Sequence, residues 1–563
     1  MSISRPRLVI IGVVLLVVVL GITILALPTA LTLFAETDVA DHQPAEFTEV
    51  AHERGFVYEY VEDEAFGNKI SLTTDAGLYV VDYNQNGWED ILAIGGAEPI
   101  LFENRGGTFA ESSALPGIGT SANGALFFDH DNDGYEDLLL LPPDAQPIFL
   151  ENQGGEFVEQ DIGFDVKLTN PTGATAGDFT GNGCLDIFII QNGDWDDATP
   201  VGTGERGVGE EDNGNPNYLV FGDCENFELV DSPTVTQNRW TLAVTAADLT
   251  GNGHTDIYEA NDFNADILYE NQGDGTFERQ RIVNSDRNAM SATLGDVTGD
   301  HRLEVFVTNI FFDEHIIGEL PIAEASADRA RGNNLFVNLG ESPVDQAVRL
   351  NVREGGWGWA AIIEDLNNDG NRSIVHTTSP IGVDRALQER LQWDQERLYY
   401  NYPYLKYPMI FDRATETRFR SAHPPERGFE ESDGRGLVAI DSDGDGTIDL
   451  AMATVKSPYK LYDNHGEGGN WIRVEVTGDQ NHTQIGAEIV VTAGNESWYG
   501  VKHSQSDFLS QESRILHFGI DDADRIDLQV TWPDGTERTF EDVSANQQVI
   551  VSPSGELVTR DRG

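Results

Sequence analysis

The feature that most constrains this fold is a nine-residue acidic unit that recurs seven times. The units are DYNQNGWED (82–90), DHDNDGYED (129–137), DFTGNGCLD (178–186), DLTGNGHTD (248–256), DVTGDHRLE (296–304), DLNNDGNRS (365–373) and DSDGDGTID (441–449). A short apolar run precedes each unit and another follows it. Most repeats then carry a third run, a Gly-rich turn and a fourth run that begins at a Phe. Four short strands per repeat, at a base spacing of 47 to 49 residues, are typical of a propeller blade.

The number of units predicts an all-β protein with a seven-bladed propeller over 47–468. The three longer intervals between units contain insertions, so no blade is missing. The seventh repeat reaches Asn470 without a fourth strand, whereas FTEVAHERGF at 47–56 offers a strand that begins at a Phe. We therefore expect the N-terminal strand to complete the last blade, which would remove the open edges of the sheets.

The residue types within the unit indicate calcium. Positions 1, 3, 5 and 9 almost all carry side-chain oxygens, and glycine mostly stands at position 4 or 6. Calcium takes six to eight oxygens at about 2.3–2.6 Å, and a curled backbone can add the carbonyl oxygen of position 7. An EF-hand is the rival interpretation, but it needs a glutamate at position 12, which only Glu259 supplies, and a helix after the loop. Apolar runs that predict strands follow these units instead.

The predicted calcium ligands fall into seven sets. They are Asp82, Asn84, Asn86, Trp88 and Asp90; Asp129, Asp131, Asp133, Tyr135 and Asp137; Asp178, Thr180, Asn182 and Asp186; Asp248, Thr250, Asn252 and Asp256; Asp296, Asp300 and Glu304; Asp365, Asn367 and Asp369; and Asp441, Asp443, Asp445, Thr447 and Asp449. The second and seventh sets have four carboxylates each and are expected to bind most tightly. The third and fourth have two, the fifth lacks the central glycine, and the sixth ends in Ser373.

These repeats resemble the integrin-α-type FG-GAP and VCBS repeats of calcium-binding seven-bladed propellers. The C-terminal stretches NWIRVEVTGDQNHTQIGAEIVVTAG, FLSQESRILHFGI and IDLQVTWPDGTERTFEDVSANQQVIV resemble the ASPIC/UnbV domain that follows such repeats in the cartilage acidic protein family. Their alternating pattern and the turn at 532–535 predict a small β-sandwich or barrel over 469–553, before a tail at 554–563. The resemblance implies an extracellular interaction protein and carries over no catalytic residue.

The N-terminus predicts a membrane anchor. Residues 8–34 form an uncharged apolar run longer than the ~20 residues that a helix needs to cross a bilayer. Arg5 and Arg7 precede this run and acidic residues follow it, which places 1–7 in the cytoplasm and the chain beyond the 35–46 linker outside the cell. A cleaved signal peptide ending near Ala35 is the alternative, although its apolar core is normally about 7–15 residues.

The charge excludes some partners. With 96 Asp and Glu against 35 Lys and Arg, the formal net charge is −61. Nucleic acid and anionic lipid headgroups both require clustered cations, so neither is an expected partner. The repeat units hold 21 of the acids, and the charge without them is still near −40. Because dense surface charge destabilises a compact state unless salt screens it, we predict a protein from a halophile.

Signs of catalysis are weak. No HExxH, GxSxG or P-loop motif occurs, and the GxGxxG match at 202–207 lies in an acidic insertion with no predicted strand before it. Cys184 and Cys224 belong to one repeat, which predicts a disulfide, with two buried free thiols as the alternative. The chain is therefore expected not to be an enzyme.

One stretch, 376–427, concentrates aromatic residues and arginines on an otherwise acidic chain. It offers Trp393, Tyr400, Tyr404 and Arg413 as a possible partner surface, and the alternative is an insertion that packs on its own propeller. Together these features predict a membrane-anchored extracellular calcium-binding module for cell-surface interaction or adhesion, with a protein or glycan partner. The alternative function is an extracellular enzyme that acts on polysaccharide at a propeller face.

Overall fold

The computed structural model describes residues 43–60, 76–193, 214–311, 331–379 and 406–560, apart from short gaps at 162, 164, 283–284, 286–287, 341, 416–417, 456, 467, 479–483 and 505–506. The described chain is all-β. Its helices are short: α2 (Ala51–Arg54), α5 (Ala347–Leu350) and the 3-10 helix η4 (Pro424–Arg427). The strands form nine sheets, of which seven come from the repeats and two from the C-terminal region.

Within each of the seven repeat sheets the strands of the repeat pair antiparallel, in the order expected from the repeat. The first three sheets are β2 (Gly77–Val81), β3 (Asp90–Ile94), β4 (Ile100–Asn104) and β5 (Phe109–Glu111); β6 (Ala125–Phe128), β7 (Asp137–Leu140), β8 (Ile148–Asn152) and β9 (Phe157–Gln160); and β10 (Pro171–Gly177), β11 (Asp186–Gln191), β13 (Tyr218–Gly222) and β14 (Phe227–Val230). The fourth and fifth are β15 (Asn238–Ala247), β16 (Asp256–Asp262), β17 (Ile267–Asn271) and β18 (Phe277–Arg281), joined by β12 (Asn215–Pro216); and β19 (Ser291–Gly295), β20 (Glu304–Thr308), β21 (Asn334–Val337) and β22 (Val344–Asp345).

The last two repeat sheets complete the set. The sixth is β23 (Gly358–Glu364), β24 (Ser373–Thr378), β25 (Met409–Thr415) and β26 (Arg418–Ala422), and the seventh is β27 (Gly434–Ile440), β28 (Asp449–Thr454), β29 (Lys460–Asn464) and β1 (Phe47–Glu49). As predicted, fourth strands begin at Phe109, Phe157, Phe227 and Phe277. The acidic units connect the first and second strands of each sheet, and we call them loops 1 to 7 in chain order.

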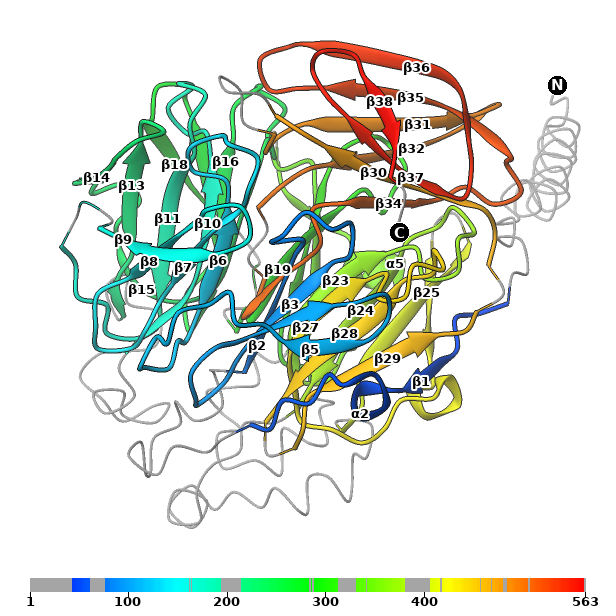
Figure 1. Ribbon diagram of the computed structural model, residues 1–563, viewed down its shortest axis with the longest axis horizontal. Coiled ribbons are helices and arrows are strands. Elements are labelled where there is room, and N and C mark those ends of the chain that lie inside the picture. Colours follow the sequence, from blue (N-terminus) through cyan, green and yellow to red (C-terminus); the bar gives the residue numbers. More distant parts are fainter. Residues whose placement is uncertain are drawn as a thin grey trace, which may run out of the picture.

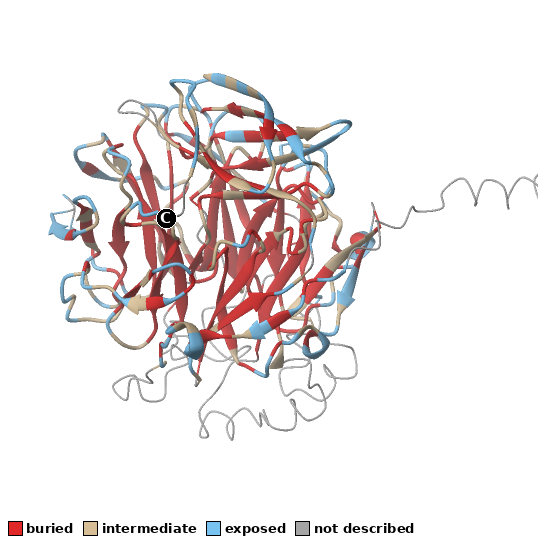
Figure 2. Cartoon of the chain, turned by 45° about the vertical axis from the view of Figure 1, so that its right-hand side comes forward, coloured by how far each residue is buried: buried red, intermediate tan, exposed pale blue. Residues whose placement is uncertain are grey.

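The seven sheets are arranged in a ring. Their first strands contact one another in the order β2, β6, β10, β15, β19, β23 and β27, and β27 contacts β2 again. These inner strands are almost wholly buried, whereas the fourth strands such as β9 and β18 carry the exposed residues (Figure 2). Small and apolar residues in the first strands, such as GLYVV and ALFF, allow this close approach around the centre.

The N-terminal strand closes the ring. β1 pairs antiparallel with β29, with Phe47 opposite Asn464 and Glu49 opposite Tyr462. The seventh sheet therefore takes three strands from the end of the repeat region and one from its beginning. The pairing agrees with the fourth strand that the sequence pattern places at 47–56.

The C-terminal region is a sandwich of two four-stranded sheets, drawn in orange to red in Figure 1. One sheet contains β30 (Trp471–Val476), β34 (Leu516–Gly519), β37 (Gln547–Val551) and β38 (Leu557–Thr559). The other contains β31 (Glu488–Ala493), β32 (Glu496–Val501), β35 (Arg525–Thr531) and β36 (Glu537–Ser544). Their apolar faces share one core, and β38 extends the sandwich past residue 553, where the sequence predicted its end.

A segment of the C-terminal region enters the centre of the ring. We call Ser504 and residues 507–511 the plug segment, which includes the short strand β33 (Ser510–Gln511) paired in parallel with β2. Leu509 O accepts the amide of Leu78 at 3.0 Å, and Ser510 Oγ accepts the amide of Leu437 at 2.9 Å. A Cβ on Gly77 would lie 2.6 Å from Leu509 O, so only glycine allows the plug to come so close.

The plug segment bonds to six of the seven inner strands. Asp507 accepts the amide of Ala292 on β19 at 3.1 Å through Oδ1 and that of Ala361 on β23 at 2.6 Å through Oδ2. Ser504 accepts the amide of Ala176 on β10, and Gln511 exchanges two hydrogen bonds with Phe127 on β6. The C-terminal sandwich and the ring of sheets are thus joined through a shared buried interior, which the sequence analysis did not predict.

No helix in the described part of the chain has the length and apolar character needed to span a membrane. The anchor predicted at 8–34 lies outside the described residues. Most of the aromatic and arginine-rich stretch, with Trp393, Tyr400 and Tyr404, lies outside them as well. Arg413 is described: its guanidinium lies 5.0 Å from the ring of Phe419 and it donates to the main-chain oxygen of Val297, so it packs on its own sheets.

Candidate metal centres

All seven loops curl around the carboxylate of their first residue. In loop 1, Asp82 accepts the main-chain N–H of Asn86 at 3.0 Å through Oδ1 and that of Gly87 at 2.9 Å through Oδ2. In the other loops the sixth residue likewise donates its main-chain N–H to the first, namely to Asp129, Asp178, Asp248, Asp296, Asp365 and Asp441. This turn brings the oxygen-bearing side chains of one loop together.

The fifth residue completes the turn in the same way. Its side-chain oxygen accepts the N–H of the seventh residue at 2.7–3.2 Å in every loop. These acceptors are Asn86, Asp133, Asn182, Asn252, Asp300, Asp369 and Asp445. Loop 5, which lacks the central glycine, keeps this geometry because His301 adopts a left-handed φ of 62° at the sixth position. The missing glycine of loop 5 and the terminal Ser373 of loop 6 therefore leave the backbone turns of these loops intact.

Three loops bring three carboxylates within reach of one cation. In loop 2, Asp129, Asp131 and Asp133 each have an oxygen within 4.8 Å of the others, and Asp441, Asp443 and Asp445 do the same in loop 7. In loop 5 the set is Asp296, Asp300 and Glu304. Two oxygens on opposite sides of a calcium ion lie about 4.6–5.2 Å apart, so these spacings fit that ion.

The ninth residue anchors the loop to its own sheet. Asp186 accepts the amides of Phe179 and Thr180 through Oδ2 and the amide of Gly222 through Oδ1, all within 3.0 Å. Asp256 and Glu304 accept two amides of their own loops in the same manner. These carboxylates are almost fully buried. The ninth position, predicted only as a calcium ligand, thus also has a structural role.

Loop 1 leaves one buried oxygen available. Asp90 Oδ1 accepts the amide of Asn104 at 2.7 Å, whereas Oδ2 is buried and makes no hydrogen bond of good geometry among the described residues, although the Tyr83 amide favours the charged form of this carboxyl. Burial, with repulsion from Asp82 and Glu103, raises the pKa of Asp90 to about 9. Because a buried carboxylate oxygen without a partner is costly, a cation at this loop would relieve an unfavourable arrangement.

The other loops show the same electrostatic strain. Burial, together with repulsion from Asp137 and Asp133, raises the pKa of Asp129 to about 7. Burial is also the main cause that raises the pKa of Asp186 to about 7 and that of Glu304 to about 8. Without a cation these carboxyl groups hold protons in the folded state that a divalent ion would displace.

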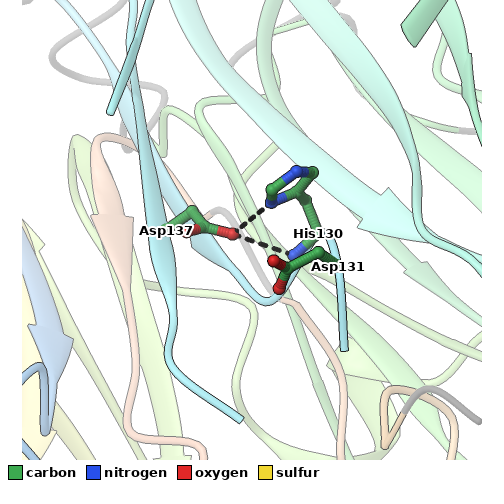
Figure 3. Close-up of side chains that lie close together, drawn as sticks. All are labelled: His130, Asp131 and Asp137. Carbon is green, nitrogen blue, oxygen red and sulfur yellow. Dashed lines mark hydrogen bonds and ion pairs between the residues drawn. The ribbon is translucent and has the colours of Figure 1, made fainter. Parts of the chain in front are cut away.

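Loop 2 also contains a histidine at its second position, and ligand atoms of His130, Asp131 and Asp137 lie within 4.8 Å of one another. His130 donates from Nδ1 to Asp137 Oδ2 at 2.6 Å (Figure 3), and its ring packs 4.9 Å from that of Phe149. The hydrogen bond and charge of Asp137 outweigh the effect of burial and raise the pKa of His130. The His130 ring therefore interacts directly with the ninth carboxylate of the loop.

Four asparagines each link a loop to the next sheet, and the sequence analysis missed them. Asn104, at the end of β4, donates from Nδ2 to the main-chain oxygen of Ser442 in loop 7 at 2.8 Å. The same bond joins Asn152 to Tyr83, Asn271 to Phe179 and Asn464 to Leu366. The available signal was the asparagine that ends the third strand in LFEN, FLEN, LYEN and LYDN. The loops are therefore part of the contact between neighbouring sheets.

The loops also face the C-terminal sandwich. Arg560 donates to Asp82 of loop 1 at 2.6 Å, and Arg473 donates to Asp441 of loop 7 at 3.2 Å. Trp498 Nε1 bonds to the main-chain oxygen of Gly370 in loop 6 at 2.8 Å. A disulfide between Cys184 and Cys224, with Cα atoms 5.2 Å apart, ties loop 3 to its hairpin. The loops thus lie at the interface between the ring and the sandwich.

Two families match this chain. The family described as "ASPIC and UnbV" matches residues 477–557, and the "FG-GAP-like repeat" matches 82–140, 129–189 and 248–307. The fold and loops define a β-propeller of FG-GAP-like repeats. The chain joins these repeats to an ASPIC and UnbV domain and is homologous to cartilage acidic protein 1, as the sequence resemblance predicted.

The similarity to individual proteins is distant. "Cartilage acidic protein 1" of Mus musculus is 23% identical over 337 residues, which are 52% of this chain and 51% of that protein. The Homo sapiens protein of the same name is 30% identical over 110 residues, 19% of this chain and 17% of that protein. This chain thus spans about half the length of the mouse relative. The solved structure "YCF48 bound to D1 peptide" aligns with a TM-score of 0.38 and 11% identity over 76% of this chain and 97% of that one.

Proposed function

We propose that this chain is an extracellular, calcium-stabilised seven-bladed propeller that acts as an interaction or adhesion module at the cell surface. The observation that carries the proposal is the common geometry of the seven loops, in which the first and fifth side chains curl the backbone around one point. Calcium would supply the positive charge that these buried carboxylates need.

The setting of the loops explains why calcium would stabilise the whole molecule. Each loop connects the first two strands of a sheet, and in four sheets an asparagine bonds the loop of the preceding sheet. Ordering a loop would therefore order the contact between two sheets. Since a ligand that binds only the folded state stabilises it by mass action, bound calcium would raise the unfolding temperature.

The proposed extracellular location and partner are supported by observations other than the loop geometry. Homology to cartilage acidic protein 1 and the apolar run at 8–34 favour a chain held at the outside of a membrane, with a protein or glycan as partner. The plug segment argues against the alternative of a polysaccharide-acting enzyme with a site in the central channel, because it fills that part of the channel with the chain's own residues.

The test is a calcium count on the full chain. After exhaustive chelation, equilibrium dialysis against buffered calcium should load several ions per chain, and the unfolding temperature should rise with calcium but much less with magnesium. Magnesium is the matched control because it demands six short bonds in octahedral geometry. An unfolding temperature that does not change between chelator and millimolar calcium would contradict the proposal.

A further inference from the structure

Two clusters of carboxylates meet in the seventh sheet and share one residue. The first is the loop 7 set of Asp441, Asp443 and Asp445. The second consists of Asp443, Asp449 and Asp463, whose oxygens also lie within 4.8 Å of one another. Asp463 lies outside the nine-residue unit, on β29, and the sequence analysis did not single it out. Asp443 therefore belongs to both clusters.

The second cluster already holds a cation, the guanidinium of Arg54. Its Nη2 donates to Asp443 Oδ2 at 2.9 Å and also to Asp463 Oδ1, while Nη1 lies 3.8 Å from Asp449 Oδ2. Nη1 donates in addition to Ser442 Oγ at 2.8 Å. The Arg54 side chain is only 16% exposed, and that of Asp449 only 1%. Poor hydration makes such contacts stronger than those of a surface ion pair.

Arg54 comes from the segment that closes the ring. It is the last residue of α2, which follows β1 directly. Two residues later, Phe56 packs its ring 5.1 Å from that of Phe102 and 5.6 Å from that of Phe109, both in the first sheet. The guanidinium thus lies at the seam where the first and seventh sheets meet, and it ties the N-terminal segment to loop 7.

Loop 2 provides a comparison within the same chain. It has the same four aspartates as loop 7, at positions 1, 3, 5 and 9. Among the described residues, no arginine or lysine forms an ion pair with Asp129, Asp131 or Asp133, and the neighbouring Arg514 pairs with Glu136 at 2.6 Å instead. The two loops that the sequence ranks as equal therefore differ in the cations that the fold places beside them.

We propose that Arg54 is a resident counter-ion of loop 7, which holds the N-terminal segment in place without calcium and weakens calcium binding at that loop relative to loop 2. The proposal rests on the proposed calcium binding of the loops. Asp443 Oδ2 is occupied by Arg54, which leaves Oδ1 for the loop, where it accepts the amide of Asp445 at 3.2 Å. A fixed positive charge beside the ion lowers calcium affinity by direct repulsion.

The consequence is a thermodynamic linkage between ring closure and calcium. Removing the charge of Arg54 leaves three carboxylates facing one another at the seam, so the calcium-free protein loses stability. The same change removes the repulsion felt by calcium in loop 7, so this loop binds the ion more tightly. The variant therefore depends more on calcium than the parent does.

The experiment compares the full chain with Arg54→Met, Arg54→Lys and the control Arg105→Met, which removes an exposed pair with Glu103. Unfolding temperatures are measured in chelator and in saturating calcium. Ion binding at loop 7 is measured by terbium emission. The indole of Trp471 lies against Gly446 of that loop and sensitises a terbium ion bound there. The signal assigned to loop 7 is the emission that is lost in Trp471→Phe. Arg54→Met should unfold a few degrees lower in chelator, gain more from calcium than the parent, and bind terbium at least about fivefold more tightly.

Each outcome has a defined meaning. Arg54→Lys should fall between the parent and Arg54→Met, and Arg105→Met should match the parent. An unchanged or weaker terbium affinity in Arg54→Met would overturn the proposal, as would a variant that fails to fold even in saturating calcium. If no loop binds calcium in the parent, the proposed function fails, and the part of the proposal that concerns calcium affinity falls with it. In that case an unfolding temperature of Arg54→Met that drops in chelator still identifies Arg54 as a counter-ion.

Discussion

The side chain of Asn152, at the end of β8, donates from Nδ2 to the main-chain oxygen of Tyr83 in loop 1 at 2.8 Å. A second bond from Nδ2 reaches Glu136 O at 3.1 Å, and Oδ1 accepts the amide of Gly155 at 2.7 Å. One buried amide thus connects loop 1, loop 2 and a hairpin. The neighbouring sheets are therefore joined by polar bonds at the level of the loops as well as by apolar packing below them.

The first prediction concerns this asparagine. Asn152→Ala should lower the free energy of unfolding by about 2–4 kcal/mol, because it leaves buried main-chain groups without partners. Denaturant unfolding of the calcium-loaded protein measures the change. Gln153→Ala is the control, since that side chain is exposed and should cost less than about 0.5 kcal/mol. Equal effects of the two substitutions would show that the asparagine links do not stabilise the ring.

The second prediction concerns the calcium ligands of loop 2. Asp131→Asn removes one charge at the third position without changing the shape of the side chain, and it should weaken calcium binding at that loop about tenfold or more. Isothermal titration after chelation measures the loss. Asp161→Asn, at an exposed residue outside the loops, should leave the titration unchanged. A full set of sites with parental affinity in Asp131→Asn would remove Asp131 from the ligands.

The third prediction concerns pH. The pKa values of Asp129, Asp186 and Glu304 are raised to about 7, 7 and 8 by burial, so the calcium-free folded state binds protons more tightly than the unfolded state does. Stability from these groups is present at acidic pH, near the unfolded values of about 4, and is lost as pH rises through about 7–8.

The unfolding midpoint of the chelated protein should therefore be lower at pH 8.5 than at pH 6, at constant salt. Saturating calcium should remove most of this difference, since the ion replaces the protons. A chelated midpoint that rises between pH 6 and pH 8.5 would mean that the loop carboxylates are ionised and stable without a cation.

The fourth prediction concerns the plug segment. Asp507 is buried, and its two oxygens accept amides from β19 and β23. Asp507→Ala should cost about 3–5 kcal/mol, because two main-chain amides lose their acceptor inside the protein. Asp507→Asn keeps one acceptor and should cost less.

Thermal unfolding of the parent should remain one transition, because the ring and the sandwich share this interior. Separate transitions would show that the two parts fold independently.

The fifth prediction concerns salt. Without the loop acids the net charge is still near −40, and these like charges should repel one another at low ionic strength. The Debye length is about 10 Å at 0.1 M salt and about 3 Å at 1 M, so concentrated salt screens this repulsion. With calcium held saturating, the unfolding midpoint should fall as KCl is lowered from about 3 M to 0.1 M. A midpoint that stays constant would mean that the acidity does not reflect adaptation to salt.

The sequence by itself determined the repeating part of this protein. A buried strand needs apolar residues either at alternate positions or throughout, and a tight loop needs glycine or asparagine at positions with left-handed backbone. Both requirements leave a local sequence pattern that recurs with every repeat. The number of repeats, the order of their strands, the positions of the loops and the partner of β1 could all be read from that pattern. Each depends on residues close together in the chain, or on one missing strand.

Only the tertiary structure decided what lies beside the loops. Arg54 contacts loop 7 although almost 400 residues separate them in the chain. Asp507 contacts the inner strands of the ring although it belongs to the C-terminal region. Each of these contacts occurs once in the molecule, so no recurring sequence pattern indicates it. The energy of a charge depends on the neighbours and burial that folding creates. The two loops with four aspartates therefore have the same ligand pattern in sequence, and they differ because folding places Arg54 and Arg473 against the aspartates of loop 7.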